Sequence, residues 1–150
     1  MRCHMQAIQT LKELRENPYQ DTDIDTDCIV SFELIERDKL RRYIENTYLY
    51  SRVQHSENMQ SEQRGITIVK SDLSAELLKE QIIWEKKNNN RYITFLMKEE
   101  ITEGFPNDLI RQLQLIQQKH RTGAVISRFL VCAQEEGKIY DFYKTFVEII

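Results

Sequence analysis

Glycine and proline are scarce in this sequence, and their scarcity constrains the fold more than any other feature does. The 150 residues include 4 Gly and 2 Pro, whereas the two residue types together average about 12% of a protein. Gly and Pro supply most of the backbone conformations that tight turns require. We therefore expect long elements with few tight turns, and a many-stranded sandwich is disfavoured.

The composition indicates one globular domain. Leu, Ile, Val and Phe account for 42 of the 150 residues, well above the roughly 20% below which disorder is expected. The length fits one hydrophobic core. The net charge of −3 argues against a tight, non-specific nucleic-acid binder, because such proteins carry a clear basic excess.

Cysteine usage and hydropathy point to a soluble intracellular protein. Cys3, Cys28 and Cys132 form no CxxC pair, so neither a disulfide framework nor a zinc site is predicted. Apolar runs stay far below the ~20 residues that span a bilayer, and the first residues do not resemble a secretory signal. We expect no metal, no cofactor and no membrane contact.

The first half of the chain is predicted to be mainly helical. Apolar residues at three-residue spacings predict a short amphipathic helix over 5–16. Residues 19–27 are predicted to form an acidic linker. Its Asp residues alternate as they do in a calcium-binding loop, but the Gly and the Glu that such a loop requires are absent. Apolar residues every three to five positions predict a longer helix over 32–53. Residues 54–64 lack an apolar stripe and are predicted to be a loop or a fraying helix end.

Two further elements precede the C-terminal region. Gly65 opens a β-branched run over 66–69, which predicts a short strand. Ser71 can cap a following helix. The buried side of that helix would carry Leu73, Leu77, Leu78, Ile82 and Ile83.

The C-terminal region has the clearest pattern. β-Branched and aromatic residues, helical periodicity and turn residues follow one another. They predict a strand over 92–97, a helix over 108–120, a strand over 129–133, a hairpin turn with Gly137 over 134–137, and a strand over 138–144 that runs into 146–150. The expected core residues here are Leu113, Ile116, Phe129 and Val131.

These elements predict an α+β fold, in which N-terminal helices precede a strand–helix–β-hairpin unit that forms a small mixed sheet. The expected organisation is an N-terminal helix with its acidic linker over 1–27, followed by a single α+β domain over 28–150.

No catalytic constellation is apparent. His4, His55 and His120 are not paired with a Cys or Ser in a local motif, and no glycine-rich phosphate loop occurs. The acidic pairs Glu99-Glu100 and Glu135-Glu136 are adjacent in sequence, and adjacent residues point to opposite faces of a strand. Basic residues would form an RNA-binding patch only if the fold gathered them. They are Arg41, Arg42, Lys86, Lys87, Arg64, Arg91, Lys119, Arg121 and Arg128.

The last strand is apolar on both faces and must be covered on both. Either it is a central strand of the domain's own sheet, or a partner covers it. Because it is the last strand, it can lie at a sheet edge, where unpaired backbone groups invite pairing with another chain. The predicted partner-binding residues are Ile139, Tyr140, Phe142, Tyr143 and Phe146.

Residues 91–146 carry a family resemblance. The strand RYITFLM, the helix NDLIRQLQLIQQKH and the hairpin FLVCAQEEGKIYDFYK together resemble the endonuclease-like domain of tRNA-splicing endonuclease subunits. Catalytic chains of that family use a Tyr, a His and a Lys, none of which can be placed on this segment. The resemblance therefore implies a small non-catalytic subunit of a nuclear complex. Such a subunit pairs with a catalytic subunit and reaches precursor tRNA through the complex. The helix over 5–16 and the acidic linker are not part of the family pattern.

Three hypotheses remain open at this point. The first is the structural subunit of a tRNA-splicing endonuclease, which is no enzyme by itself. The second is an intracellular α+β adaptor of a different multiprotein complex. The third is a small hydrolase or thiol enzyme that uses Cys28 or Cys132 with a distant His.

Overall fold

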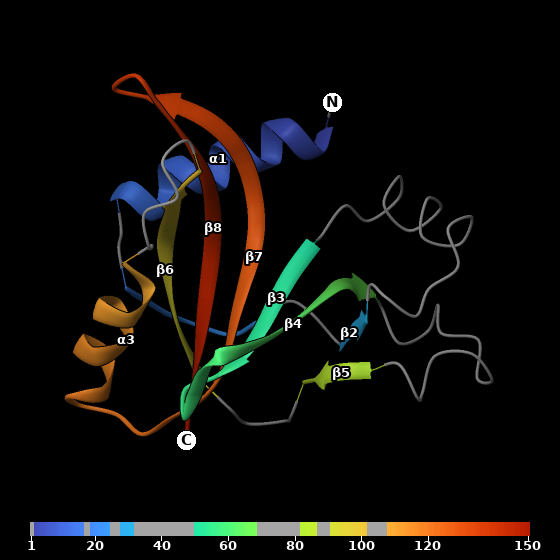
Figure 1. Cartoon of the computed structure of the whole chain (residues 1–150), viewed down its shortest axis with the longest axis vertical. Coiled ribbons are helices and arrows are strands. Elements are labelled where there is room, and N and C mark those ends of the chain that lie inside the picture. Colours follow the sequence, from blue (N-terminus) through green and yellow to red (C-terminus); the bar gives the residue numbers. More distant parts are fainter. Residues whose placement is uncertain are drawn as a thin grey trace.

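The computed structural model describes residues 2–16, 19–24, 28–31, 50–68, 82–86, 91–101 and 108–150. These residues form the elements labelled in Figure 1. In chain order they are α1 (Arg2–Glu16), β1 (Gln20–Thr22), β2 (Cys28–Ser31), β3 (Tyr50–His55), β4 (Asn58–Ile68), β5 (Ile82–Glu85), β6 (Arg91–Glu100), α3 (Leu109–Gln117), β7 (Thr122–Glu135) and β8 (Lys138–Ile149).

The eight strands form one sheet in the order β1-β6-β8-β7-β3-β4-β2-β5. Every neighbouring pair is antiparallel. The predicted small mixed sheet preceded by N-terminal helices is therefore wrong, because the described chain forms mostly one antiparallel sheet. The expectation of long elements is confirmed, because four strands have ten residues or more.

Strands replace the predicted helix end and loop over residues 50–64. In β3 the buried positions alternate, with Ser51 and Val53 facing inward. Because the buried Ser51 is polar, the sequence of β3 does not show the alternation of apolar and polar residues that marks a strand. The first half of β4 is almost entirely exposed and polar, and its strand conformation comes from pairing with β3.

The predicted helix after Ser71 is wrong where it can be compared. Ile82 and Ile83 belong to β5, which pairs with β2. Two adjacent isoleucines fit a strand that is covered on both faces as well as they fit a helix. Residues 32–49 and 71–81, which were predicted as helix, lie outside the described residues, as do residue 69 of the predicted strand and the linker residues 25–27.

The C-terminal predictions are confirmed. β6, α3, β7 and β8 follow in the expected order, and β6 and β7 are longer than predicted. The turn between β7 and β8 has two positive backbone angles, at Glu136 (φ 50°) and Gly137 (φ 79°), as in the two-residue hairpins that favour Gly at the second position. Of the expected core residues, Leu113, Ile116 and Val131 are buried, and Phe129 is partly buried against the core.

The helices cover opposite faces of the β6–β8–β7 region. α3 joins β6 to β7, and its Leu109, Leu113 and Ile116 pack against a face that includes Phe95 and Tyr143. α1 covers the other face near the β7–β8 turn (Figure 1), where Leu14 packs against residues that include Leu130 and Phe142. On that same face, farther from the turn, Ile24 and Trp84 close a third cluster around Tyr92, Ile126 and Phe146.

The N-terminal segment is part of this sheet. The predicted helix over 5–16 is confirmed by α1 and begins earlier. Within the acidic linker, β1 pairs with β6. Its carboxylates neutralise neighbouring cations, since Asp21 pairs with Arg91 and Asp23 with Lys86. In the described part of the chain, no helix is long and apolar enough to cross a membrane.

Candidate functional site: the outer side and the end of strand β6

The strand that carries the predicted partner-binding residues lies inside the sheet. β8 is hydrogen-bonded to β6 on one side and to β7 on the other, so the expected edge position is wrong. Phe142, Tyr143 and Phe146 are buried within the chain's own clusters. The alternative of a central strand describes β8 correctly, because α1 and α3 cover its two faces.

One predicted site residue does reach the surface. Ile139 is 42% exposed, and Ile101, directly after β6, is 45% exposed. The Ile101 N–H donates a hydrogen bond to the Ile139 carbonyl oxygen at 3.0 Å, which continues the β6–β8 ladder by one residue. Directly opposed residues project from the same face of a sheet. The two isoleucines therefore form an exposed apolar pair, the Ile101–Ile139 pair.

The outer side of β6 is covered over only part of its length. β1 pairs with Tyr92, Ile93 and Thr94, and the Tyr19 ring lies tilted against Phe95 with ring centroids 5.7 Å apart. Among the described residues, no strand pairs with 95–98 on the side away from β8. β6 is thus the outermost described strand at this position.

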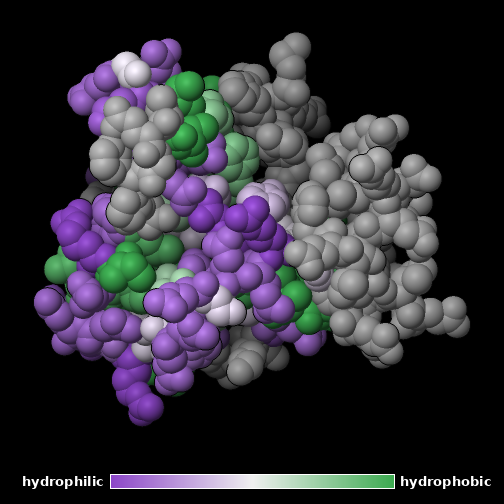
Figure 2. Space-filling model, viewed as in Figure 1, coloured by the Kyte–Doolittle hydropathy of each residue, from purple (hydrophilic) through white to green (hydrophobic). Residues whose placement is uncertain are grey.

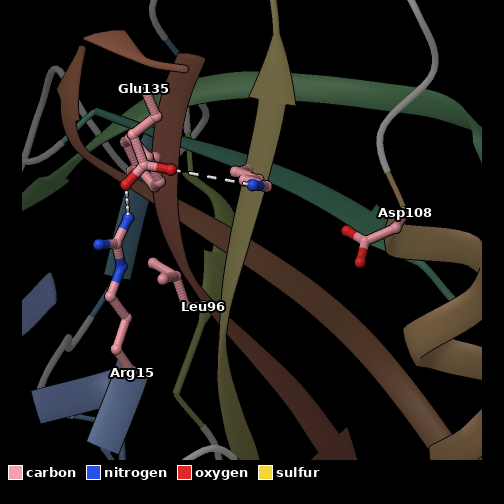
Figure 3. Close-up of a pocket in the computed structure, with 6 residues that line it drawn as sticks. Arg15, Leu96, Asp108 and Glu135 are labelled. Atoms are coloured by element: carbon pink, nitrogen blue, oxygen red, sulfur yellow. Dashed lines mark hydrogen bonds and ion pairs between the residues drawn. The ribbon is translucent and has the colours of Figure 1, made fainter. Parts of the chain in front are cut away.

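A pocket of about 300 Å³ opens beside this part of β6. Its lining residues come from α1, the N-cap of α3 and the strands β6, β7 and β8, and they are Arg15, Leu96, Lys98, Asp108, Glu135 and Phe142. Figure 3 shows Asp108 on one side of β6, and Arg15 and Glu135 on the other. The pocket therefore has an apolar floor and a charged rim.

The rim charges are held by specific contacts. The Glu135 carboxylate accepts a bond from Arg15 and lies 3.8 Å from the Lys98 ammonium. Arg15 also lies over the ring of Phe142, at 5.4 Å from its centroid, and Lys98 lies over Tyr140 at 4.7 Å. Such cation–π contacts orient the charged groups. The Glu135 carboxylate thus interacts with two cations, Arg15 and Lys98, on this side of the pocket.

A second polar network occupies the face that α3 covers. The Arg52 guanidinium donates two hydrogen bonds to Glu99, at 2.9 and 3.2 Å, and one to the Tyr143 hydroxyl. It also lies 4.5 Å from the centroid of the Tyr143 ring. Burial alone would lower the pKa of Arg52, but the bonds to Glu99 and Tyr143 outweigh it and raise the pKa. Arg52 therefore remains charged, and its hydrogen bonds link β3 to β6 and β8.

Of the two cysteines whose side chains are described, Cys28 and Cys132, neither has the environment of a nucleophile. Cys28 is fully buried. Desolvation and a hydrogen bond with the opposed Asp141 raise the pKa of the exposed Cys132, whereas reactive cysteines need a lowered pKa. His55 Nδ1 accepts the backbone N–H of Glu57 at 3.2 Å. In the described residues, no three His, Cys, Asp or Glu side chains are grouped to hold a metal.

Among the described residues, four of the basic side chains considered for an RNA-binding patch make contacts within the chain. Arg64 pairs with Glu62, while Arg91 and Lys86 pair with the acidic linker. Arg128 is buried on the α1-covered face, over the ring of Phe146. Arg41, Arg42 and Lys87 lie outside the described residues. On the face in Figure 2, hydrophilic residues dominate the coloured surface and hydrophobic ones form separate patches.

Arg15, Lys98 and Ile101 are not among the site residues that the sequence predicts. Ile101 follows the acidic pair that ends β6, and Ile139 follows the turn, so each looks like an isolated apolar residue. Only the β6–β8 register brings them together. No family model, no curated protein and no solved structure was found to match this chain.

Proposed function

We propose that this chain is a non-catalytic structural subunit of a tRNA-splicing endonuclease. It binds a catalytic subunit at the end of the sheet where β6 ends and β8 begins. The observation that carries the proposal is the Ile101–Ile139 pair, two large apolar side chains that are both more than 40% exposed and share one face. Exposed apolar side chains that are contiguous, rather than scattered singly, are a feature of protein-binding sites.

Two further observations support this role. The segment that carries the family resemblance folds as strand, helix and hairpin in the order the resemblance expects. The raised pKa of Cys132 and the buried position of Cys28 weigh against the thiol-enzyme hypothesis. As a subunit of this complex, the protein would act in the nucleus and reach precursor tRNA through its partner.

The direct test is reconstitution with the named complex. The full chain is co-expressed with the catalytic endonuclease subunits of the same organism, and the mixture is examined by sedimentation and by cleavage of an intron-containing precursor tRNA. We expect a stable hetero-complex that cleaves, and a pure chain that does not. A chain that stays separate from these subunits would contradict the proposal and favour an adaptor of another complex.

A matched pair of variants tests the surface. Ile139→Glu introduces a charge into the Ile101–Ile139 pair, whereas Ile110→Glu makes the same change on α3 at an isoleucine that is 47% exposed. We expect the first to weaken the complex about tenfold, a difference of about 1.4 kcal/mol, and the second to leave it unchanged. Circular dichroism checks that both variants keep the fold.

A further inference from the structure

We infer that the outer side of β6 at residues 95–98 receives an extended segment of the partner as an added strand, and that an acidic side chain of this segment enters the pocket beside Arg15 and Lys98. This inference rests on the proposed function, because it describes how the same partner is held.

The mismatch between two strand lengths provides the first argument. β6 has 10 residues and β1 has 3, and β1 pairs with β6 only as far as Thr94. In an antiparallel sheet, the backbone groups of successive residues point alternately to the two neighbouring strands. About half of the N–H and C=O groups of residues 95–98 therefore point away from β8. An outer strand of this kind is a template for strand addition by another chain.

The pocket supplies the second argument. When a peptide adds to a sheet, the backbone bonds provide affinity and pockets for alternate side chains provide specificity. Leu96 and Lys98, two alternate residues of the outer strand, both line the pocket. Its volume of about 300 Å³ lies at the lower end of the range for ligand sites, which suits a single inserted side chain.

The charges of the rim select that side chain. The Arg15 and Lys98 side chains are 47% and 52% exposed, and both interact with Glu135. On the opposite side of β6, Asp108 is engaged by Arg111 and Gln112. The Arg15 side of the pocket therefore carries an excess of one positive charge, which complements an Asp or Glu of the added segment.

The end of β6 also leads to the Ile101–Ile139 pair, which projects from the face of the sheet opposite to Leu96 and Lys98. Ile101 directly follows β6, so a strand that runs along 95–98 would arrive at these exposed isoleucines. Backbone pairing would then hold the segment, and its alternate side chains would reach the charged pocket on one face and the apolar pair on the other.

Hydrogen exchange tests the added strand directly. The probe is the full chain in its reconstituted complex with the catalytic endonuclease subunits, compared with the chain alone. We expect slower exchange on binding for the amides of residues 95–98 that point away from β8, and little change for the amides of β8, which are already bonded on both sides. A complex that forms without protection at 95–98 would overturn the added strand and leave the proposed function standing.

Charge reversal tests the pocket. We expect the double variant Arg15→Glu/Lys98→Glu to raise the Kd of the complex about tenfold or more. The control Arg64→Glu, a 60% exposed arginine on β4, should change the Kd less than about twofold. Equal effects of the double variant and the control would refute the pocket. If no complex forms with wild-type chain, the proposed function fails and the added strand fails with it.

Discussion

Two buried tyrosines allow a sharp test of the hydrogen bonding inside the sheet. Tyr92 and Tyr143 are 0% and 3% exposed and lie on opposite faces. The Tyr143 hydroxyl accepts a bond from the Arg52 guanidinium, whereas the Tyr92 hydroxyl is buried with no hydrogen-bond partner among the described residues. The same change, Tyr→Phe, therefore removes a satisfied hydroxyl at one position and an unsatisfied one at the other.

The expected effects differ in sign. A hydrogen bond to a charged group contributes about 1.5–3 kcal/mol. Arg52 keeps both bonds to Glu99, so Tyr143→Phe should lower the free energy of unfolding by about 1–2 kcal/mol. An unsatisfied buried hydroxyl is itself unfavourable, so Tyr92→Phe should leave the stability unchanged or raise it by up to about 1 kcal/mol.

Urea denaturation followed by circular dichroism measures both variants against wild type. With a slope of about 2 kcal/mol per molar urea, the two midpoints should differ by about 1 M. Equal losses for both variants would refute the reasoning, because they would mean that the Tyr92 hydroxyl is bonded in solution. Unchanged slopes would confirm that the native and unfolded states have kept their compactness.

Alkaline pH provides an independent check on Tyr92. Burial, with Glu148 and Asp23 nearby, raises the pKa of Tyr92 to about 12, against about 10 in an unfolded chain. Between these values the unfolded state releases the phenolic proton and the folded state retains it, so stability falls as pH rises, by up to about 1.4 kcal/mol per pH unit. Below pH 10 this tyrosine adds no pH dependence. The part of the stability loss above pH 10 that is due to Tyr92 should be absent in the Tyr92→Phe variant.

Three further predictions concern packing and charge. Leu113→Ala on α3, at a residue 3% exposed, should cost about 2–5 kcal/mol in denaturant melts, and a loss under about 1 kcal/mol would contradict its place in the core. Gly65→Ala should cost about 3 kcal/mol, because the new Cβ would lie 2.2 Å from the Val30 carbonyl oxygen. The control Gly123→Ala meets a carboxylate side chain and should cost less in the same melts. Glu99→Gln should cost about 1–2 kcal/mol at neutral pH, since it leaves the 12% exposed Arg52 without its main counter-charge, and an unchanged midpoint would show that Arg52 is satisfied without Glu99.

Local sequence signals were sufficient for the C-terminal elements. The β-branched and aromatic run in β6, the periodicity of α3 and the glycine of the β7–β8 turn each depend on neighbouring residues. α1 was predicted for the same reason. The start of the hairpin could be located because Gly137 supplies the positive backbone angle that the turn requires.

Local signals misled where a strand depends on its neighbours. The polar first half of β4 has no apolar alternation of its own, and its conformation comes from hydrogen bonds to β3. Ile82 and Ile83 satisfy a helical spacing and a strand equally well, and pairing with β2 selects the strand. Propensity is a weak guide where pairing decides the outcome.

The sequence by itself determined that the last strand is apolar on both faces and follows a tight hairpin. It did not determine what lies on each side of that strand. Because α3 carries the chain over the sheet from β6 to β7, β8 returns between these two strands, and Phe142 and Tyr143 become core. In the tertiary structure the candidate binding surface lies on the outer side of β6 instead of on β8. Hydrogen bonding between strands that are distant in sequence decides which strand is outermost.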